Sequence, residues 1–105
     1  MEKQFKLIFD EVMIKDLKQA AKNEHIKSII ISMLDKLESF GPDAGKLLDS
    51  KLFLYEIKNK HPPIRIYFKP KKGTSEIYVF EFEMKTSPEK QKDTIKELRE
   101  KLSKS

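Results

Sequence analysis

The sequence predicts an α+β domain in which helices pack on a curved antiparallel sheet. Two observations lead to this fold class. Apolar residues recur at helical spacing between residues 10 and 40, and from Lys51 they recur at every second position instead. The connections between the later strand candidates are short, which favours an antiparallel meander. A chain of 105 residues suits one domain, so we expect a single domain over residues 1–105.

The first half of the chain predicts a strand followed by a helical hairpin. Residues 4–11, QFKLIFDE, place aromatic and aliphatic side chains at every second position, as in a strand. Asp10 is expected to cap the first helix. Residues 26–40 follow the i, i+3, i+4, i+7 apolar pattern of a helix that packs on a core, and Gly41-Pro42 ends it.

The second half predicts a meander of three strands and a final helix. The strand candidates are KLFLYEIK (51–58), PIRIYFKP (63–70) and EIYVFEFEMK (76–85). The segment SPEKQKDTIKELREKL (87–102) reads as an amphipathic C-terminal helix with a serine cap and a proline in its first turn. The element order is therefore strand, two helices, three strands and helix.

Side chains alternate across a strand, so each strand of the meander divides into two faces. We expect the more apolar set to face the helices, because a charged set there would be buried without partners. Leu54 and Val79 then fall on the opposite face. The apolar set is Phe53, Tyr55, Ile57, Ile64, Ile66, Phe68, Tyr78, Phe80, Phe82 and Met84. The polar set is Glu56, Lys58, Arg65, Tyr67, Lys69, Glu81, Glu83 and Lys85.

This polar face has two interpretations that spacing alone does not separate. It is either a solvated sheet surface with cross-strand ion pairs, or a cationic groove for an RNA or DNA backbone with Tyr67 as a stacking surface. The formal net charge of +5 favours a polyanionic or negatively charged partner, and it also suits a surface kept soluble by charge.

The composition excludes several classes of site. The chain has no cysteine, which excludes disulfides and thiol catalysis, and His25 and His61 are too far apart in sequence to suggest a metal site. No metal and no cofactor is therefore expected. No apolar stretch approaches the length of a membrane span and no signal peptide is evident, so we expect a cytoplasmic protein without membrane contact.

The meander carries a resemblance to a known family. The segments LFLYEIK, IRIYF and FEMKTSP resemble the strand motifs of the RelE/ParE toxin superfamily, closest to its phage-derived HigB-like branch. The order of elements is also similar over nearly the whole chain. The resemblance implies a RelE-like fold and the toxin of a type II toxin–antitoxin system. Such toxins are usually ribosome-dependent endoribonucleases that cut mRNA without a metal ion, by attack of the ribose 2′-OH on the adjacent phosphate.

The resemblance also implies partners and catalytic residues. The partners are a cognate antitoxin and mRNA on the ribosome, with a monomeric toxin inside a hetero-oligomeric complex. Arg65 would clamp the scissile phosphate, because its forked guanidinium suits bidentate contact. Lys58 and Lys85 would neutralise developing charge or transfer a proton. Glu81 or Glu83 would be a base, or an ion-pair partner of the lysines. Since Arg65 faces away from the expected core, its substitution is expected to leave folding almost unchanged.

Four further residues are candidates for RNA binding. Tyr67 would stack on a base, or pack on its strand neighbours, and Lys69 would contact phosphate. Lys60 and His61 lie in the turn before the central strand, where His61 is either a proton carrier or an ordinary exposed histidine. Met84-Lys85 stands where the family has two lysines. A non-nucleolytic, ParE-like topoisomerase inhibitor, a catalytically decayed toxin fold and a simple nucleic-acid-binding domain therefore remain alternatives.

Overall fold

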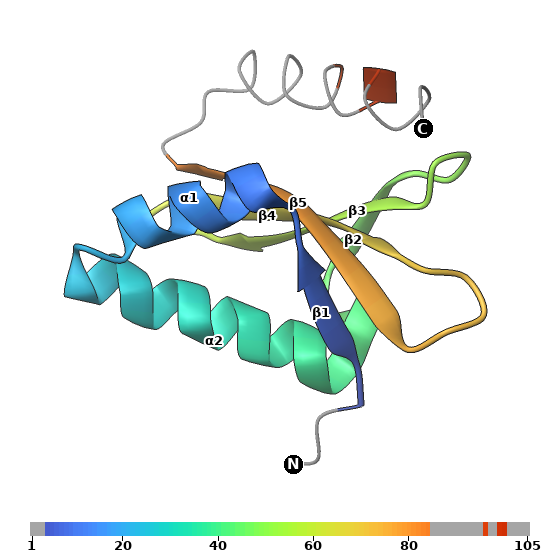
Figure 1. Cartoon of the computed structure of the whole chain (residues 1–105), viewed down its shortest axis with the longest axis horizontal. Coiled ribbons are helices and arrows are strands. Elements are labelled where there is room, and N and C mark those ends of the chain that lie inside the picture. The colour runs from blue at the N-terminus through green and yellow to red at the C-terminus, as the bar shows by residue number, and fades with distance from the viewer. Residues whose placement is uncertain (1–3, 85–95, 97–98, 101–105) are drawn as a thin grey trace.

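The computed structural model describes residues 4–84 together with Lys96, Arg99 and Glu100. Residues 4–84 form two α-helices, a 3-10 turn (η1) and five strands in one open sheet (Figure 1). The elements are β1 (Lys6–Phe9), α1 (Glu11–Ala20), α2 (Glu24–Phe40), η1 (Gly41–Ala44), β2 (Lys46–Asp49), β3 (Leu54–Asn59), β4 (Ile64–Pro70) and β5 (Glu76–Met84). The predicted α+β fold is confirmed.

The sheet has the order β1-β5-β4-β3-β2. The antiparallel meander of β3, β4 and β5 is confirmed and forms its centre. Strand β1 pairs in parallel with β5, and β2 is an edge strand that the sequence did not reveal. The four residues of β2 are too few to show an alternating pattern. The C-terminal helix predicted over 87–102 lies outside the described residues, except that Lys96, Arg99 and Glu100 are helical.

Side-chain caps fix where both helices begin. The Asp10 carboxylate accepts a hydrogen bond from the Val12 N–H at 3.0 Å, which confirms the predicted cap of α1. Asn23 caps α2 by accepting from His25 and Ile26. Helix α2 ends at Gly41, whose φ of 61° favours glycine. A β-carbon there would lie 2.5 Å from the ring of Phe5, the residue before β1, so the close packing of this ring also requires glycine.

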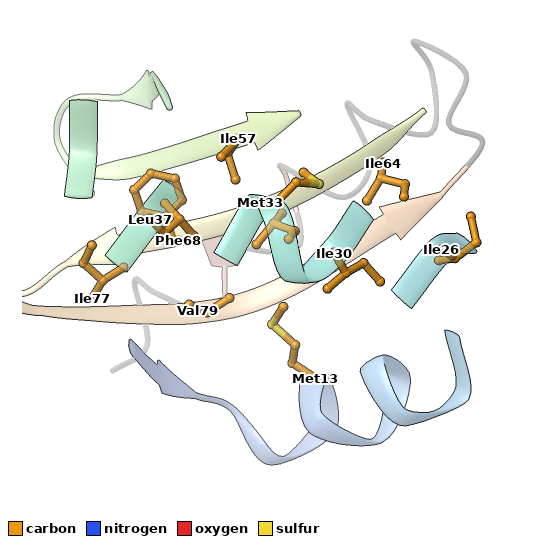
Figure 2. Packing of buried hydrophobic residues seen from close by; sticks show 11 residues of the cluster. Met13, Ile26, Ile30, Met33, Leu37, Ile57, Ile64, Phe68, Ile77 and Val79 are labelled. Carbon is orange, nitrogen blue, oxygen red and sulfur yellow. The ribbon is translucent and has the colours of Figure 1, made fainter. Parts of the chain in front are cut away.

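The main core lies between the two helices and one face of the sheet. Figure 2 shows Ile30, Met33 and Leu37 of α2 directed towards the strands, where Phe68 and Val79 are fully buried. This confirms that the apolar stripe of residues 26–40 is core. No helix in the described part of the chain is long and apolar enough to cross a membrane.

A bulge in β5 changes which residues face this core. The register pairs Tyr67 with Glu81 but Phe68 with Val79, so Phe80 is an extra residue in β5. Before the bulge, Ile77 and Val79 point to the helices, and after it Phe82 and Met84 do.

The single alternation that we expected for β5 is therefore wrong in its first half. Tyr78 and Phe80 were assigned to the core and Val79 to the opposite face, whereas Val79 is in the main core and Tyr78 is 37% exposed. Phe53 was also assigned to the core, but it precedes β3, has a φ of 52° and is 41% exposed.

Candidate active site on the outer sheet face

The candidate site lies on the face of the sheet opposite the main core, which we call the outer face. Two rows of side chains cross its three central strands. Lys58, Arg65 and Glu83 are register partners in the first row. Glu56, Tyr67 and Glu81 are partners in the second row. Because partners across a sheet point to the same side, these six of the eight polar residues that alternation predicted for one face come together.

Arg65 is held by an ion pair within this face. Its Nη1 donates to Glu56, at 3.2 Å from one carboxylate oxygen and 3.5 Å from the other. The Glu56 side chain is 6% exposed and that of Arg65 is 22% exposed. A carboxylate that is so deeply buried would destabilise the fold without a positively charged partner. Glu56 therefore orients the guanidinium of Arg65 and limits its motion.

Tyr67 does not offer a ring for base stacking. It is fully buried and belongs to a second apolar cluster on the outer face, with Leu54 and Phe80 at its centre and Leu48 and Leu52 packed against them. The bulge in β5 supplies Phe80 to this cluster, since without it Phe80 would point to the helices. The predicted stacking role of Tyr67 is therefore corrected to a packing role, because no part of the ring is accessible.

Buried polar atoms surround the Tyr67 hydroxyl. Its oxygen and both carboxylate oxygens of Glu83 are buried and make no hydrogen bond. Burial raises the pKa of Tyr67 above its ordinary value, and the Glu83 and Glu56 carboxylates raise it further. A tyrosine in this state keeps its proton, so Tyr67 is unsuited to act as a base in the neutral range.

The described basic residues that were predicted to bind or cleave RNA differ in position and exposure. Lys58 is exposed on β3 beside Arg65, and Lys69 is half-buried on β4. Lys60 and His61 are exposed in the β3–β4 turn. Lysines with these positions can meet a phosphate backbone that approaches from solvent.

Of the two remaining catalytic candidates, only Glu81 belongs to β5. Glu81 is half-buried next to Tyr67 in the second row. Lys85, which was predicted to neutralise charge, lies outside the described residues. The described residues contain no group of three His, Cys, Asp or Glu side chains that could hold a metal ion.

Glu56 is the residue of the site that sequence reasoning placed on this face but gave no role. The sequence did contain a cue to this role. Glu56 lies two positions before Lys58, so an antiparallel pairing of Lys58 with Arg65 places Glu56 diagonally across from Arg65. The register makes Glu83 the direct cross-strand neighbour of Arg65, so only the assembled structure reveals the bond between Arg65 and Glu56. The arrangement can therefore present an oriented guanidinium and an exposed lysine to an anion.

Comparison with known proteins identifies the fold. No protein-family model matches the chain, and no curated protein matches its sequence. The isolated E. coli RelE toxin superposes with a TM-score of 0.56 and 21% identity, over 90% of this chain and 98% of that chain. A free-state E. coli RelE with two arginine-to-alanine substitutions gives a TM-score of 0.58 and 18% identity, over 91% and 98%. The chain therefore has the fold of the RelE toxin, as the resemblance implied, while a place in the HigB-like branch stays a prediction.

Proposed function

We propose that this protein is the toxin of a toxin–antitoxin pair and cleaves mRNA on the ribosome. The observation that supports this best is the oriented Arg65 with exposed Lys58 as its cross-strand neighbour, at the centre of a RelE-like sheet. A permanently charged guanidinium beside an ammonium group suits a phosphate that gains negative charge during reaction. The toxin acts in the cytoplasm as a monomer and is held by an antitoxin in a hetero-oligomeric complex.

The proposed reaction needs no metal ion. The ribose 2′-OH attacks the adjacent phosphorus, its proton passes to a base, and the bond to the 5′-oxygen breaks as that oxygen takes a proton. The products are a 2′,3′-cyclic phosphate and a 5′-hydroxyl. Arg65 contacts the non-bridging phosphate oxygens through the transition state, and Lys58 and Lys85 neutralise the added charge. A guanidinium carries five N–H donors in a planar fork that matches the oxygens of a phosphate.

Proton transfer is assigned to residues beside this pair. Glu81 is the proposed base, since it lies one row from Arg65 on the same face. Lys69, Lys60 and His61 are proposed to bind the RNA on either side of the scissile phosphate, which requires only surface charge and hydrogen-bond donors. Tyr67 supports the site by packing beside it, with Leu54 and Phe80.

The test is single-turnover cleavage of mRNA on programmed ribosomes, with primer extension from cells that express the protein. We expect growth arrest by the wild-type chain. Arg65→Ala should reduce cleavage by roughly 10²-fold or more, and Arg65→Lys should restore part of it, because an ammonium group cannot make a bidentate contact. Lys15→Ala, on the exposed side of α1, is the matched control.

Two outcomes would overturn the proposal in different ways. Growth arrest with intact mRNA would exclude nuclease action and favour a non-nucleolytic toxin such as a topoisomerase inhibitor. Cleavage by Arg65→Ala at the wild-type rate would show that the outer face is not the active site.

A further inference from the structure

A small pocket, which we call the Phe53 pocket, opens at the end of the sheet where the β2–β3 and β4–β5 turns lie (Figure 1). It has a volume of about 250 Å³ and is open to solvent. The ring of Tyr55 lines it and is held in place by stacking on the buried Phe68, at 5.5 Å between ring centres. Phe53, Pro42 and Pro70 also line it. Its walls therefore include several flat, apolar rings.

Phe53 has an unfavourable backbone conformation at this pocket. Its φ of 52° lies in the left-handed region, which is costly for a bulky residue and is usually occupied by glycine in hairpin turns. Phe53 is nonetheless 41% exposed, so much of its apolar surface is not used in packing. Backbone strain of this kind is found most often where a residue contacts a ligand. An exposed aromatic ring at a strained position therefore indicates a binding role.

Lysines border the exposed ring. The Lys72 ammonium lies 5.7 Å from the centre of the Phe53 ring, within the range of a cation–π contact. Lys51 is exposed two positions before Phe53. The carboxylate among the described lining residues is that of Glu76, which lies 3.6 Å from the Lys71 ammonium, so its charge is offset. The rim of the pocket suits an anion that also carries a flat apolar group.

The pocket is separate from the proposed active site but within reach of one RNA strand. Pro70 is five positions after Arg65 on β4, which corresponds to about 17 Å along the strand. Lys69, on the outer face, lies between them and is half-buried. Arg65, Lys69 and Lys72 thus form a series of cations that leads to Phe53. A few nucleotides of single-stranded RNA span this distance, with a negative charge at every phosphate.

We propose that the Phe53 pocket binds an unpaired nucleotide of the same RNA strand whose phosphate Arg65 contacts. The base stacks on the Phe53 ring, and Lys72, on its flexible stem, turns to the neighbouring phosphate. This nucleotide lies a few positions from the cleaved bond, on the side of Lys69. The inference rests on the proposed function for its choice of RNA, but binding in the pocket needs no cleavage.

The experiment measures binding of a hexamer of 2′-O-methyl adenosine by fluorescence anisotropy, because this RNA lacks the attacking 2′-OH and is not cut. We expect Phe53→Leu to weaken binding by roughly tenfold, since leucine is apolar but offers no ring for stacking. Phe53→Trp should bind at least as tightly as the wild type. Phe40→Leu is the matched control, because Phe40 is 46% exposed and does not line the pocket.

Two further measurements separate stacking from charge and from folding. Lys72→Ala should reduce the salt dependence of binding by about one phosphate contact, whereas Lys15→Ala, on the exposed side of α1, should not change it. Phe53→Gly should lose RNA affinity as Phe53→Leu does, yet melt close to the wild-type temperature, because relief of backbone strain offsets the lost packing. A large fall in the melting temperature of both Phe53 variants would instead make this ring a packing residue and overturn the proposal.

Three other results would overturn the proposal. Equal binding of the hexamer by the wild type and Phe53→Leu would show that no base stacks on the ring. Two hexamers bound per protein would place the nucleotide on a second RNA molecule. A hexaglutamate peptide that competes with the RNA and is weakened equally by Phe53→Leu would make the pocket a protein-binding surface. Failure of the proposed function is recognised separately, since it is measured by mRNA cleavage with Arg65→Ala.

Discussion

The Nη1 atom of Arg65 lies 3.2 Å from a carboxylate oxygen of Glu56, diagonally across strands β3 and β4. Glu56 is almost completely buried. This bond therefore contributes both to the stability of the sheet and to the orientation of Arg65, the proposed phosphate-binding residue. The sequence suggested that Arg65 could be replaced without effect on folding. The ion pair shows that expectation to be incomplete, because loss of Arg65 removes a bonding partner from a buried carboxylate.

The first prediction separates the contribution of Arg65 to stability from its contribution to cleavage. Arg65→Ala should lower the free energy of unfolding by about 1–3 kcal/mol, the usual cost of depriving a buried polar group of its partner. Adding Glu56→Gln to Arg65→Ala should recover part of that loss, because a neutral amide is cheaper to bury than a carboxylate. Urea unfolding measures both effects, and the double variant should remain inactive in cleavage. An Arg65→Ala protein as stable as the wild type would show that the ion pair contributes nothing.

The second prediction concerns Tyr67 at high pH. Burial and the nearby carboxylates raise the pKa of Tyr67, whereas in the unfolded chain it titrates near 10.0. Above pH 10 the unfolded state therefore binds fewer protons than the native state, and stability falls by up to about 1.4 kcal/mol per pH unit from this group. In Tyr67→Phe this part of the loss of stability above pH 10 should be absent.

Near neutral pH the same variant should be unchanged or stabilised by up to about 1 kcal/mol, since the hydroxyl makes no hydrogen bond. Unfolding by denaturant at pH 7 and at pH 11 tests both statements, with Tyr78→Phe on the exposed part of β5 as the control. A larger loss of stability between pH 7 and pH 11 in Tyr67→Phe than in wild type would contradict the raised pKa of Tyr67.

The third prediction concerns the approach of η1 to β3 at Gly45. A β-carbon at Gly45 would lie 2.8 Å from the Phe68 ring and closer still to the backbone carbonyl oxygen of Glu56. Neither neighbour can move easily, since Phe68 is in the core and the carbonyl belongs to a strand. Gly45→Ala should therefore cost about 3 kcal/mol.

Gly73 provides the comparison for this substitution. Its φ is 81°, but nothing lies within 4 Å of an added β-carbon, so Gly73→Ala should cost only the backbone strain of about 1–2 kcal/mol. Thermal melting of the two variants side by side is the measurement. Equal stability of the two variants would show that the strand yields to the added methyl group.

The fourth prediction concerns Asp49 at low pH. Its Oδ1 accepts hydrogen bonds from the N–H groups of Lys51 and Leu52 at 3.0 and 3.1 Å, and its Oδ2 accepts from Arg99 Nε at 2.8 Å. The Leu52 N–H, then the Lys51 N–H and the charge of Arg99, lower the pKa of Asp49 below its ordinary value of 3.8.

A lowered pKa means that Asp49 stabilises the fold above pH 3.8 and that this contribution is lost as the pH falls through the lower folded-state pKa. Asp49→Asn should therefore reduce the melting temperature at pH 7 and approach the wild-type value in strong acid. Melting curves between neutral pH and pH 2 measure the difference, with Asp16→Asn on the exposed side of α1 as the control. A difference that grows in acid would be inconsistent with this role.

Local patterns in the sequence were sufficient for much of the fold. The spacing of Ile26, Ile30, Met33 and Leu37 places one face of α2 in the core, because a helix repeats every 3.6 residues whatever it packs against. Asp10 caps α1 because the bond from its carboxylate is made within its own turn. Alternation in β4 likewise directed Arg65 to the face opposite the core.

Other features depend on neighbours that are distant in sequence. The bulge at Phe80 exists only through the register of β5 on β4, and it buries Tyr67 within a second cluster instead of exposing its ring. The parallel addition of β1 and the bond between Glu56 and Arg65 likewise follow from which strands lie side by side. Alternation tells which side of a strand a residue occupies, but only the assembled sheet gives each side chain its partner and its exposure, because both are set by contacts between strands.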